Sequence, residues 1–383
     1  KRLGEKYLQH MINLRETIHM YPEDGFSEFT TSKIIIEELE KLGIKVQKNV
    51  AKTGVVGLIE GKYPGKTVLL RADMDALKIQ EQADVEYKSK IDGMMHACGH
   101  DGHVAGLLGA AMILNELKDN LHGNVKLVFQ PAEERDGGAL PMIEEGVLEN
   151  PKVDAAHLWG YLNEGEVHLK EGPMMASPDI FNINVIGKGG HGAVPQESID
   201  PIVITCQIVN SLQTIVSRKI NPLDPVVITC GRIQGGDCHN VIPNEVELEG
   251  TIRTFNEETR NWVPKVMEDL IRGITTSQGA AYEFKYEPKY PALINDKYMT
   301  SFAKESLKKV VGEENVFDLK EPNMGGEDFA YFAQKVPSAF IFVGIANNKI
   351  EPVIHHNPYF KWDSKNVGIL AQGLSQIAID YLK

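Results

Sequence analysis

Apolar residues follow a helical period at the start of the chain. The first helix is predicted from residues at three- and four-residue intervals, namely Tyr7, Leu8, Met11, Ile12, Leu14 and Ile18. A second helical pattern covers residues 31–42 and ends at Gly43, a residue typical of a helix C-cap. Both helices are expected in an outer layer of the fold.

Short apolar runs then predict strands that alternate with helices. The predicted strands cover residues 55–59, 67–70, 124–130 and 155–160, and the Ala-rich apolar run 104–114 predicts a buried helix. Such alternation is typical of an α/β sheet.

The order of elements changes near residue 173. A strand at 179–185, a helix at 202–216, strands at 226–233 and 245–254, a helix at 258–274 and a strand at 281–286 follow one another. This β-α-β-β-α-β order predicts a ferredoxin-like domain. A helix at 300–311, a strand at 339–344 and a terminal helix from about 367 resume the first pattern. We therefore expect residues 1–172 and 291–383 to form one domain and residues 173–290 to be inserted into it.

Composition excludes several classes of protein. The 383 residues are 42% hydrophobic, which is ordinary for a globular chain, and the formal net charge of -13 disfavours nucleic acid and anionic membranes as partners. No apolar run approaches the roughly 18 residues of a membrane span. Four cysteines without a disulfide-framework spacing favour a reducing compartment, the cytoplasm. The chain starts without Met and without a signal-peptide pattern, so we expect a trimmed start, and an earlier leader stays possible.

Residues 95–103 hold the densest chemistry of the chain. Three histidines, Cys98 and Asp101 lie within nine residues, directly before the buried helix. A single His or Cys is most often a packed core group, but thiolate and imidazole together are the usual ligands of Zn²⁺ and its first-row neighbours. The cluster therefore predicts a metal site.

Further candidate residues follow the predicted strands. Asp75, the adjacent Glu133 and Glu134, and His157 all lie near strand carboxyl ends, where open α/β sheets place their sites. Each has an ordinary alternative, as a turn residue, a solvated corner or a core histidine. Two adjacent carboxylates repel each other unless a cation or a proton offsets them. We expect these residues to converge on Cys98 and His100.

Six motifs in order resemble one family. They are residues 95–103, 130–134, 189–195, 240–243 with 250–253, 326–329 and 356–358. Together the chain resembles the metal-dependent amidohydrolases of the aminoacylase and carboxypeptidase group. The similarity is greatest to the branch with hippurate hydrolases, N-acetyldiaminopimelate deacetylases and auxin-conjugate hydrolases. The resemblance implies a zinc-exopeptidase-like mixed sheet flanked by helices, with an inserted ferredoxin-like lid and dimerisation domain.

The resemblance also implies a site with two divalent metal ions, Zn, Mn, Co or Ni. Its ligands would be Cys98 as the bridge, His100, Glu134, His157 and His356, the last chosen over His355 because it precedes Asn-Pro. Glu133 would be the catalytic base, and Asp75 would orient a ligand histidine. His191 would reach the site of a neighbouring subunit, and Asn240 and Arg253 would hold the substrate carboxylate. A homodimer is implied, and a tetramer is possible.

One departure from the peptide-cutting relatives bears on function. Those relatives carry His-x-Asp where this chain has Asp73-Met74-Asp75, and Asp where it has Cys98. The chain is therefore expected to hydrolyse the amide of small-molecule N-acyl-L-amino acids. The alternatives are a dipeptidase or carboxypeptidase acting on small peptides, a cysteine hydrolase in which His100 or His103 activates Cys98, and a catalytically silent ligand-binding homologue.

Overall fold

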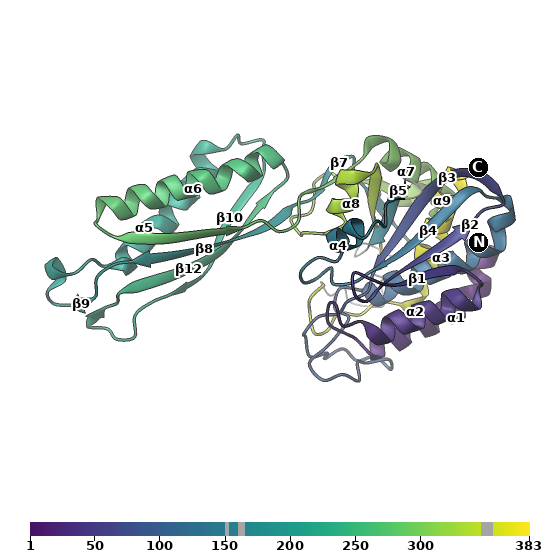
Figure 1. Cartoon of the computed structure of the whole chain (residues 1–383), viewed down its shortest axis with the longest axis horizontal. Helices are drawn as coiled ribbons and strands as arrows, with labels where there is room; N and C mark the ends of the chain where they lie inside the picture. The colour runs from purple at the N-terminus through teal and green to yellow at the C-terminus, as the bar shows by residue number, and fades with distance from the viewer. Residues whose placement is uncertain (150–152, 160–164, 346–354) are drawn as a thin grey trace. The chain divides into compact units, whose positions relative to one another are not determined.

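The computed structural model describes residues 1–149, 153–159, 165–345 and 355–383, with the backbone alone for 153–159, and divides into two compact units (Figure 1). The first unit comprises Lys1–Met174, Ile294–Glu321 and Tyr331–Lys383, and the second comprises Met175–Leu293 and Pro322–Ala330. The segment Pro322–Ala330 differs from the predicted division, because hydrogen bonds tie it to the second unit. Ala176 N–H lies 3.1 Å from the carbonyl of Asn323 and 3.0 Å from that of Gly325. The spacing of apolar residues in the sequence cannot predict such backbone hydrogen bonds.

The first unit is built on one mixed sheet with the strand order β1-β2-β4-β3-β5-β16-β6-β15. Its strands are β1 Lys45–Val50, β2 Gly54–Glu60, β3 Tyr63–Asp73, β4 His122–Gln130, β5 Val153–Trp159, β6 Val167–Leu169, β15 Val316–Asp318 and β16 Ser338–Val343. β4, β3, β5 and β16 run parallel to their neighbours in that series, so their carboxyl ends share one edge. The sequence predicted these four central strands but missed β1, an edge strand that is mostly exposed and has little apolar pattern.

Helices pack on this sheet around a buried central helix. They are α1 Arg2–Met20, α2 Phe29–Lys41, α3 His100–Leu117, α4 Ala139–Glu144, α7 Lys297–Val311, α8 Ala330–Lys335, at the boundary of the units, and α9 Val367–Tyr381. α3 is buried from His100 to Leu114 and packs between α1 and α9. Its glycines allow this approach, since a Cβ at Gly102 would lie 2.3 Å from the Trp362 ring and one at Gly109 would lie 2.0 Å from Met11 Sδ.

The second unit has the predicted ferredoxin-like topology. Its elements are β8 Ser177–Ile186, β9 Gly190–His191, α5 Pro201–Thr214, β10 Val226–Gln234, β11 Val241–Ile242, β12 Glu245–Thr254, α6 Glu257–Ser277 and β13 Ala281–Glu287. The sheet order β10-β12-β8-β13 is antiparallel throughout. α5 and α6 cover the face that carries Phe181, Ile183 and Leu248. The predicted fold class is therefore confirmed.

Short strands lie where the chain passes between the two units. β7 Gly172–Met175 pairs with β14 Leu293–Asn295 where the chain enters and leaves the second unit. No helix in the described ranges combines the length and apolar content that crossing a membrane requires. All four cysteines are free thiols.

Candidate functional site

The candidate site lies at the carboxyl ends of the parallel strands of the first unit. β3 and β4 are in register up to Asp73 and Gln130, so the segments that follow them leave the sheet side by side. Asp75 lies two residues beyond the end of β3 and is 1% exposed. β3 thus extends beyond the predicted residues 67–70 and places Arg71 and Asp73 on one side, whereas Asp75 lies in the segment that follows the strand. Parallel strands bring together residues far apart in sequence at such an edge.

Cys98, His100 and Glu134 form one group of candidate ligands. One side-chain ligand atom from each lies within 4.8 Å of the others. Gly99 has φ +89° and caps α3, so the chain turns sharply between the thiol and the helix that begins at His100. His100 Nδ1–H donates to the carbonyl of Asp75 at 3.0 Å, which leaves Nε2 directed to the group, 4.0 Å from Glu134 Oε1. This is how a ligand histidine is usually oriented.

Both histidines of the His355-His356 pair approach this group. His356 Nε2 lies 3.0 Å from Glu134 Oε1, and His355 Nδ1 lies 3.6 Å from Cys98 Sγ. His356 has φ +61°, and its N–H donates to the carbonyl of Ala97 at 2.9 Å. The loop is therefore tied to the segment that carries Cys98.

The charges of the group are those of a cation site. Burial raises the pKa of the Cys98 thiol well above its ordinary value, and the charges of Glu134, Glu133 and Asp73 raise it further. Burial alone would lower the pKa of His100, but Asp73, Asp75 and Glu134 outweigh it and raise that pKa to about 10. An excess of anionic donors around a thiol and an imidazole is what a divalent cation neutralises. These residues fit a metal ion.

A second cluster of possible ligand atoms is already satisfied by protein contacts. Asp73, His100 and His103 also lie within ligand distance of one another. However, Asp73 accepts hydrogen bonds from Arg71 Nη1 at 2.6 Å and from His103 Nδ1 at 2.5 Å. We therefore assign Asp73 and His103 a supporting role beneath His100.

Two carboxylates hold three successive backbone amides beside the group. The N–H of Glu133 donates to Asp75 Oδ1 at 3.0 Å and that of Glu134 to Asp75 Oδ2 at 2.9 Å. The preceding N–H, of Ala132, donates to Glu28 Oε1 at 2.8 Å. Ala132 has φ +55°, a left-handed conformation that costs an alanine about 1–2 kcal/mol. Asp75 thus contacts His100 mainly through its backbone carbonyl, and its Oδ1 lies slightly farther away, 3.3 Å from His100 Nδ1. The main partner of the carboxylate is the loop that carries both glutamates.

A buried ion-pair network beneath the site was missed by the sequence analysis. Asp101 Oδ2 lies 2.7 Å from Arg15 Nε and 2.8 Å from His19 Nδ1, and His19 Nε2 lies 3.2 Å from Glu81 Oε1. Removing one partner of a buried pair costs about 3–5 kcal/mol. The network therefore fixes the first turn of α3, and with it His100. Arg15 and His19 lie four residues apart on the apolar face of α1. Two polar residues on an otherwise apolar helix face are the sequence feature from which this buried network could have been predicted.

His96 lies beside this network, with its ring centroid 6.2 Å from that of His19. Burial lowers its pKa to about 3, and neither ring nitrogen has a hydrogen-bond partner among the described residues. His96 is thus a core histidine.

The remaining predicted site residues lie on β5 and in the second unit. His157 lies in β5 opposite Arg71 and Phe340, and its side chain is outside the described part of the chain. His191 pairs with Val241 where β9 meets β11, so His191 and Asn240 lie close together at one end of the second unit. Arg253 lies at the other end of β12, opposite Pro178, where its Nε–H donates to the carbonyl of Met324 at 3.2 Å.

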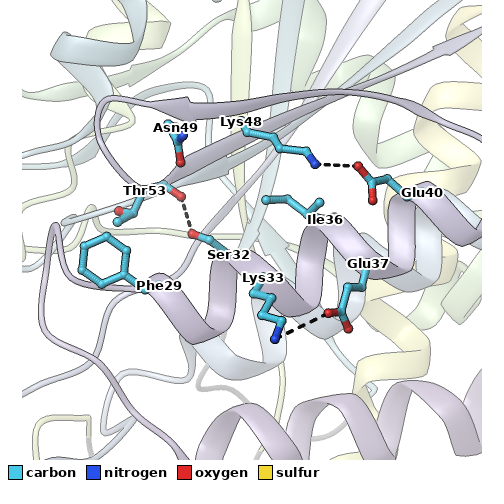
Figure 2. Close-up of a pocket in the computed structure, with 9 residues that line it drawn as sticks. All are labelled: Phe29, Ser32, Lys33, Ile36, Glu37, Glu40, Lys48, Asn49 and Thr53. Atoms are coloured by element: carbon cyan, nitrogen blue, oxygen red, sulfur yellow. Dashed lines mark hydrogen bonds and ion pairs between the residues drawn. The ribbon is translucent and has the colours of Figure 1, made fainter.

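A hollow of about 330 Å³ on the first unit is separate from these residues (Figure 2). Figure 2 shows it between α2 and the β1–β2 turn, with Phe29 at its edge. Its charged side chains pair with each other, Lys48 with Glu40 at 2.7 Å and Lys33 with Glu37 at 3.9 Å. It brings together no group of metal-ligand or nucleophilic residues.

The fold and the donor group define a metal-dependent hydrolase of the two-unit α/β type. Comparison with known proteins agrees. The chain belongs to peptidase family M20/M25/M40, whose family model matches residues 69–377. The predicted family is therefore confirmed.

Individual relatives cover almost the whole chain. An N-acetylcysteine deacetylase of Bacillus subtilis is 40% identical, over 97% of each chain. Thermostable carboxypeptidase 1 of Saccharolobus solfataricus is 42% identical, over 95% of this chain and 94% of its own. A crystal structure of the Bacillus subtilis YXEP protein, described as a dinuclear metal-binding peptidase from the M20 family, aligns with a TM-score of 0.84 and 36% identity, over 99% of each chain.

Proposed function

We propose that this protein hydrolyses the amide bond of N-acyl-L-amino acids, giving a carboxylic acid and a free amino acid. The observation that carries the proposal is the convergence of Cys98, His100 and Glu134, with Glu133 held in the same loop. The similarity to a deacetylase of an N-acyl amino acid supports the same reaction. Two divalent metal ions would be held here by Cys98, His100, Glu134, His157 and His356.

The chain's own residues divide the chemical work. Divalent ions held by these residues would supply a water of lowered pKa and would polarise the amide carbonyl. Glu133 takes a proton from the attacking water as its oxygen bonds to the carbonyl carbon. It then delivers that proton to the amine nitrogen as the C–N bond breaks. Asp75 keeps Glu133 and Glu134 in place through their amides, and the guanidinium of Arg253 binds the substrate carboxylate.

The length of β12 supports a homodimer with shared sites. Asn240 and His191 lie beyond its first residue, Glu245, whereas Arg253 lies near its last. An antiparallel strand rises about 3.4 Å per residue, so the stretch from Glu245 to Arg253 spans ~27 Å. An N-acyl amino acid is far shorter than this. Arg253 and the pair His191 and Asn240 of one chain therefore cannot hold the same substrate molecule, and we place His191 and Asn240 at the site of a second copy.

Mixing two inactive variants is expected to restore activity. Glu133→Gln removes the base, and His191→Ala removes the residue proposed to act across subunits. After subunit exchange, a mixed dimer holds one site with neither defect. Random exchange of equal amounts makes half of the dimers mixed, so about a quarter of wild-type activity should return.

Steady-state turnover of the mixture checks this, with each variant alone as the control. Absence of recovery, although mass spectrometry shows mixed dimers, would contradict the shared site. A tetramer would give the same recovery if it is built from such dimers.

A panel of substrates tests the proposed reaction. Acetyl-, benzoyl- and longer-chain acyl amino acids are expected to be turned over with higher kcat/KM than dipeptides of the same C-terminal residue, as liberated amine measures. Higher kcat/KM for the dipeptides would favour the second candidate function, a carboxypeptidase or dipeptidase, which the similarity to a carboxypeptidase supports. Turnover of neither class would favour a silent ligand-binding homologue.

Two properties of the protein complete the proposal. The native metals are Zn, Mn, Co or Ni, since a soft thiolate beside imidazole and carboxylate accepts all four. Elemental analysis of the purified protein identifies them. We also place the protein in the cytoplasm, which its four free thiols support.

A further inference from the structure

The segment between α1 and α2, residues 23–28, contacts both loops that carry the proposed catalytic carboxylates. At one end, the carbonyl of Glu23 accepts the N–H of Ala76, the residue after Asp75, at 2.9 Å. At the other end, the carboxylate of Glu28 accepts the N–H of Ala132, the residue before Glu133. None of these contacts involves a proposed metal ligand.

The middle of the same segment packs against the Glu133 loop. A Cβ at Gly25 would lie 3.0 Å from both Cα and Cβ of Ala132, so the two backbones touch. Asp24 binds Arg135 through both carboxylate oxygens at 2.9 Å. This pair is partly exposed and contributes little by itself. The buried Glu28 contact therefore carries the main polar tie between the segment and the loop.

Glu28 is itself held in one place. Its side chain is fully buried, and its second carboxylate oxygen accepts a hydrogen bond from the Thr53 hydroxyl. The carbonyl of Thr53 accepts a hydrogen bond from Ser32, which Figure 2 shows at the start of α2. Burial raises the pKa of Glu28 to about 7, and the charge of Asp75 raises it further. The hydrogen bonds from Thr53 and Ala132 act in the opposite direction and lower it. A glutamine, with one acceptor and one donor, thus imitates its protonated form.

Ala132 is the strained residue in this contact. Its N–H donates to Glu28, its carbonyl accepts the N–H of Gly137 at 3.0 Å, and its φ of +55° lies where glycine is the usual residue. Without the Glu28 acceptor, the N–H would be buried without a partner, and the alanine would relax toward negative φ. Such a rotation would redirect the next side chain, Glu133.

We propose that Glu28 is a positioning residue of the active site, whose carboxylate holds Ala132 in the left-handed conformation and so directs Glu133 at the substrate. The inference rests on the proposed function, because Glu133 is the base only in that reaction. It assigns to residues 23–28 a role in the chemical step that acts through the loop carrying Glu133.

Removing the Glu28 carboxylate is expected to lower kcat more than it changes KM. In Glu28→Ala, kcat should fall on the order of 10²-fold, the effect of misplacing a catalytic group by about 1 Å, with KM within about twofold of wild type. Adding Ala132→Gly should raise kcat of Glu28→Ala by about tenfold, because glycine adopts positive φ without cost. A merely structural role predicts no such rescue, since glycine adds backbone entropy and removes a buried methyl group.

Two further variants and a control make the test decisive. Glu28→Gln keeps the acceptor for Ala132 N–H and should retain the wild-type kcat. Glu28→Asp is one methylene too short to reach this N–H, so its kcat should fall. It serves as the test variant if Glu28→Ala does not fold. Asp296→Ala is the control, because it removes a carboxylate that caps α7 through Met299 N–H in the same unit. It should lower the melting temperature and leave kcat unchanged.

Three outcomes overturn the inference. The first is a wild-type kcat in both Glu28→Ala and Glu28→Asp. The second is an equal loss of kcat in Glu28→Gln and Glu28→Ala. The third is that Ala132→Gly does not raise the kcat of Glu28→Ala. The proposed function fails separately, if wild-type protein with excess metal does not hydrolyse acyl amino acids or if Glu133→Gln does so normally. The two failures are therefore distinguishable in one set of assays.

Discussion

Glu133→Gln is expected to lower kcat by roughly 10²–10⁴-fold, the usual contribution of a general base, while the bound metal stays unchanged. Glutamine has nearly the same shape, but it cannot take the proton of water. The Glu133 amide would still donate to Asp75, so the loop should keep its position. Steady-state kinetics together with elemental analysis of the same samples checks this result.

The matched control for Glu133→Gln is the same change at an exposed glutamate. Glu144, at the end of α4, is exposed and lies outside the proposed site, so Glu144→Gln should behave as wild type. A Glu133→Gln variant that keeps full turnover would remove Glu133 from the mechanism. Loss of metal from this variant would instead make Glu133 a ligand.

Chelation of the metal ions is expected to reduce turnover to the background rate, and adding back a divalent ion should restore it. The reason is that neither the lowered pKa of water nor the polarised carbonyl is available from the protein alone. Assays with and without chelator, followed by titration of Zn, Mn, Co and Ni, measure the effect and rank the metals. Full activity in chelator would favour the cysteine hydrolase instead.

A single substitution separates the two mechanisms further. In Cys98→Asp, a carboxylate replaces the thiolate, as in the peptide-cutting relatives from which this chain departs at that position. A metal-dependent enzyme should retain measurable turnover, because a carboxylate can also coordinate a divalent ion. A cysteine hydrolase should lose all turnover, because its nucleophile is gone. Cys206→Ser, which alters an exposed thiol on α5 of the second unit, is the control.

Sequence patterns predicted the helices and strands well where one face of the element, or the whole element, is buried. The ferredoxin-like order was readable because a strand such as β8, from Ser177 to Ile186, alternates buried and half-buried positions, and a helix such as α6 buries one residue in every three or four. The pattern failed at β1, which is mostly exposed, and at the start of α3, where His100 to His103 are polar yet buried. At these places function or an edge position, and not the apolar period, decides the residue type.

The candidate site was predicted in part for a similar reason. Cys98 and His100 lie close in sequence, so their spacing alone indicated metal chemistry. The contact of Glu28 with Ala132 joins residues 104 positions apart and involves a backbone N–H, which no residue type reveals. Likewise, the ion pair of Arg15 with Asp101 depends on the packing of α1 against α3.

By itself, the sequence determined the fold class and, through its motifs, the family, and it predicted an inserted domain and a set of candidate metal ligands. These follow from periodicity and residue chemistry, which are local properties. Only the tertiary structure decided which side chains meet. It brought Glu134 and His356 to Cys98, gave the carboxylate of Asp75 to two backbone amides, and set His191 and Arg253 at opposite ends of β12. The physical reason is that parallel strand ends and packed helices join residues that are distant in the chain, and the energy of those contacts depends on geometry that no local pattern encodes.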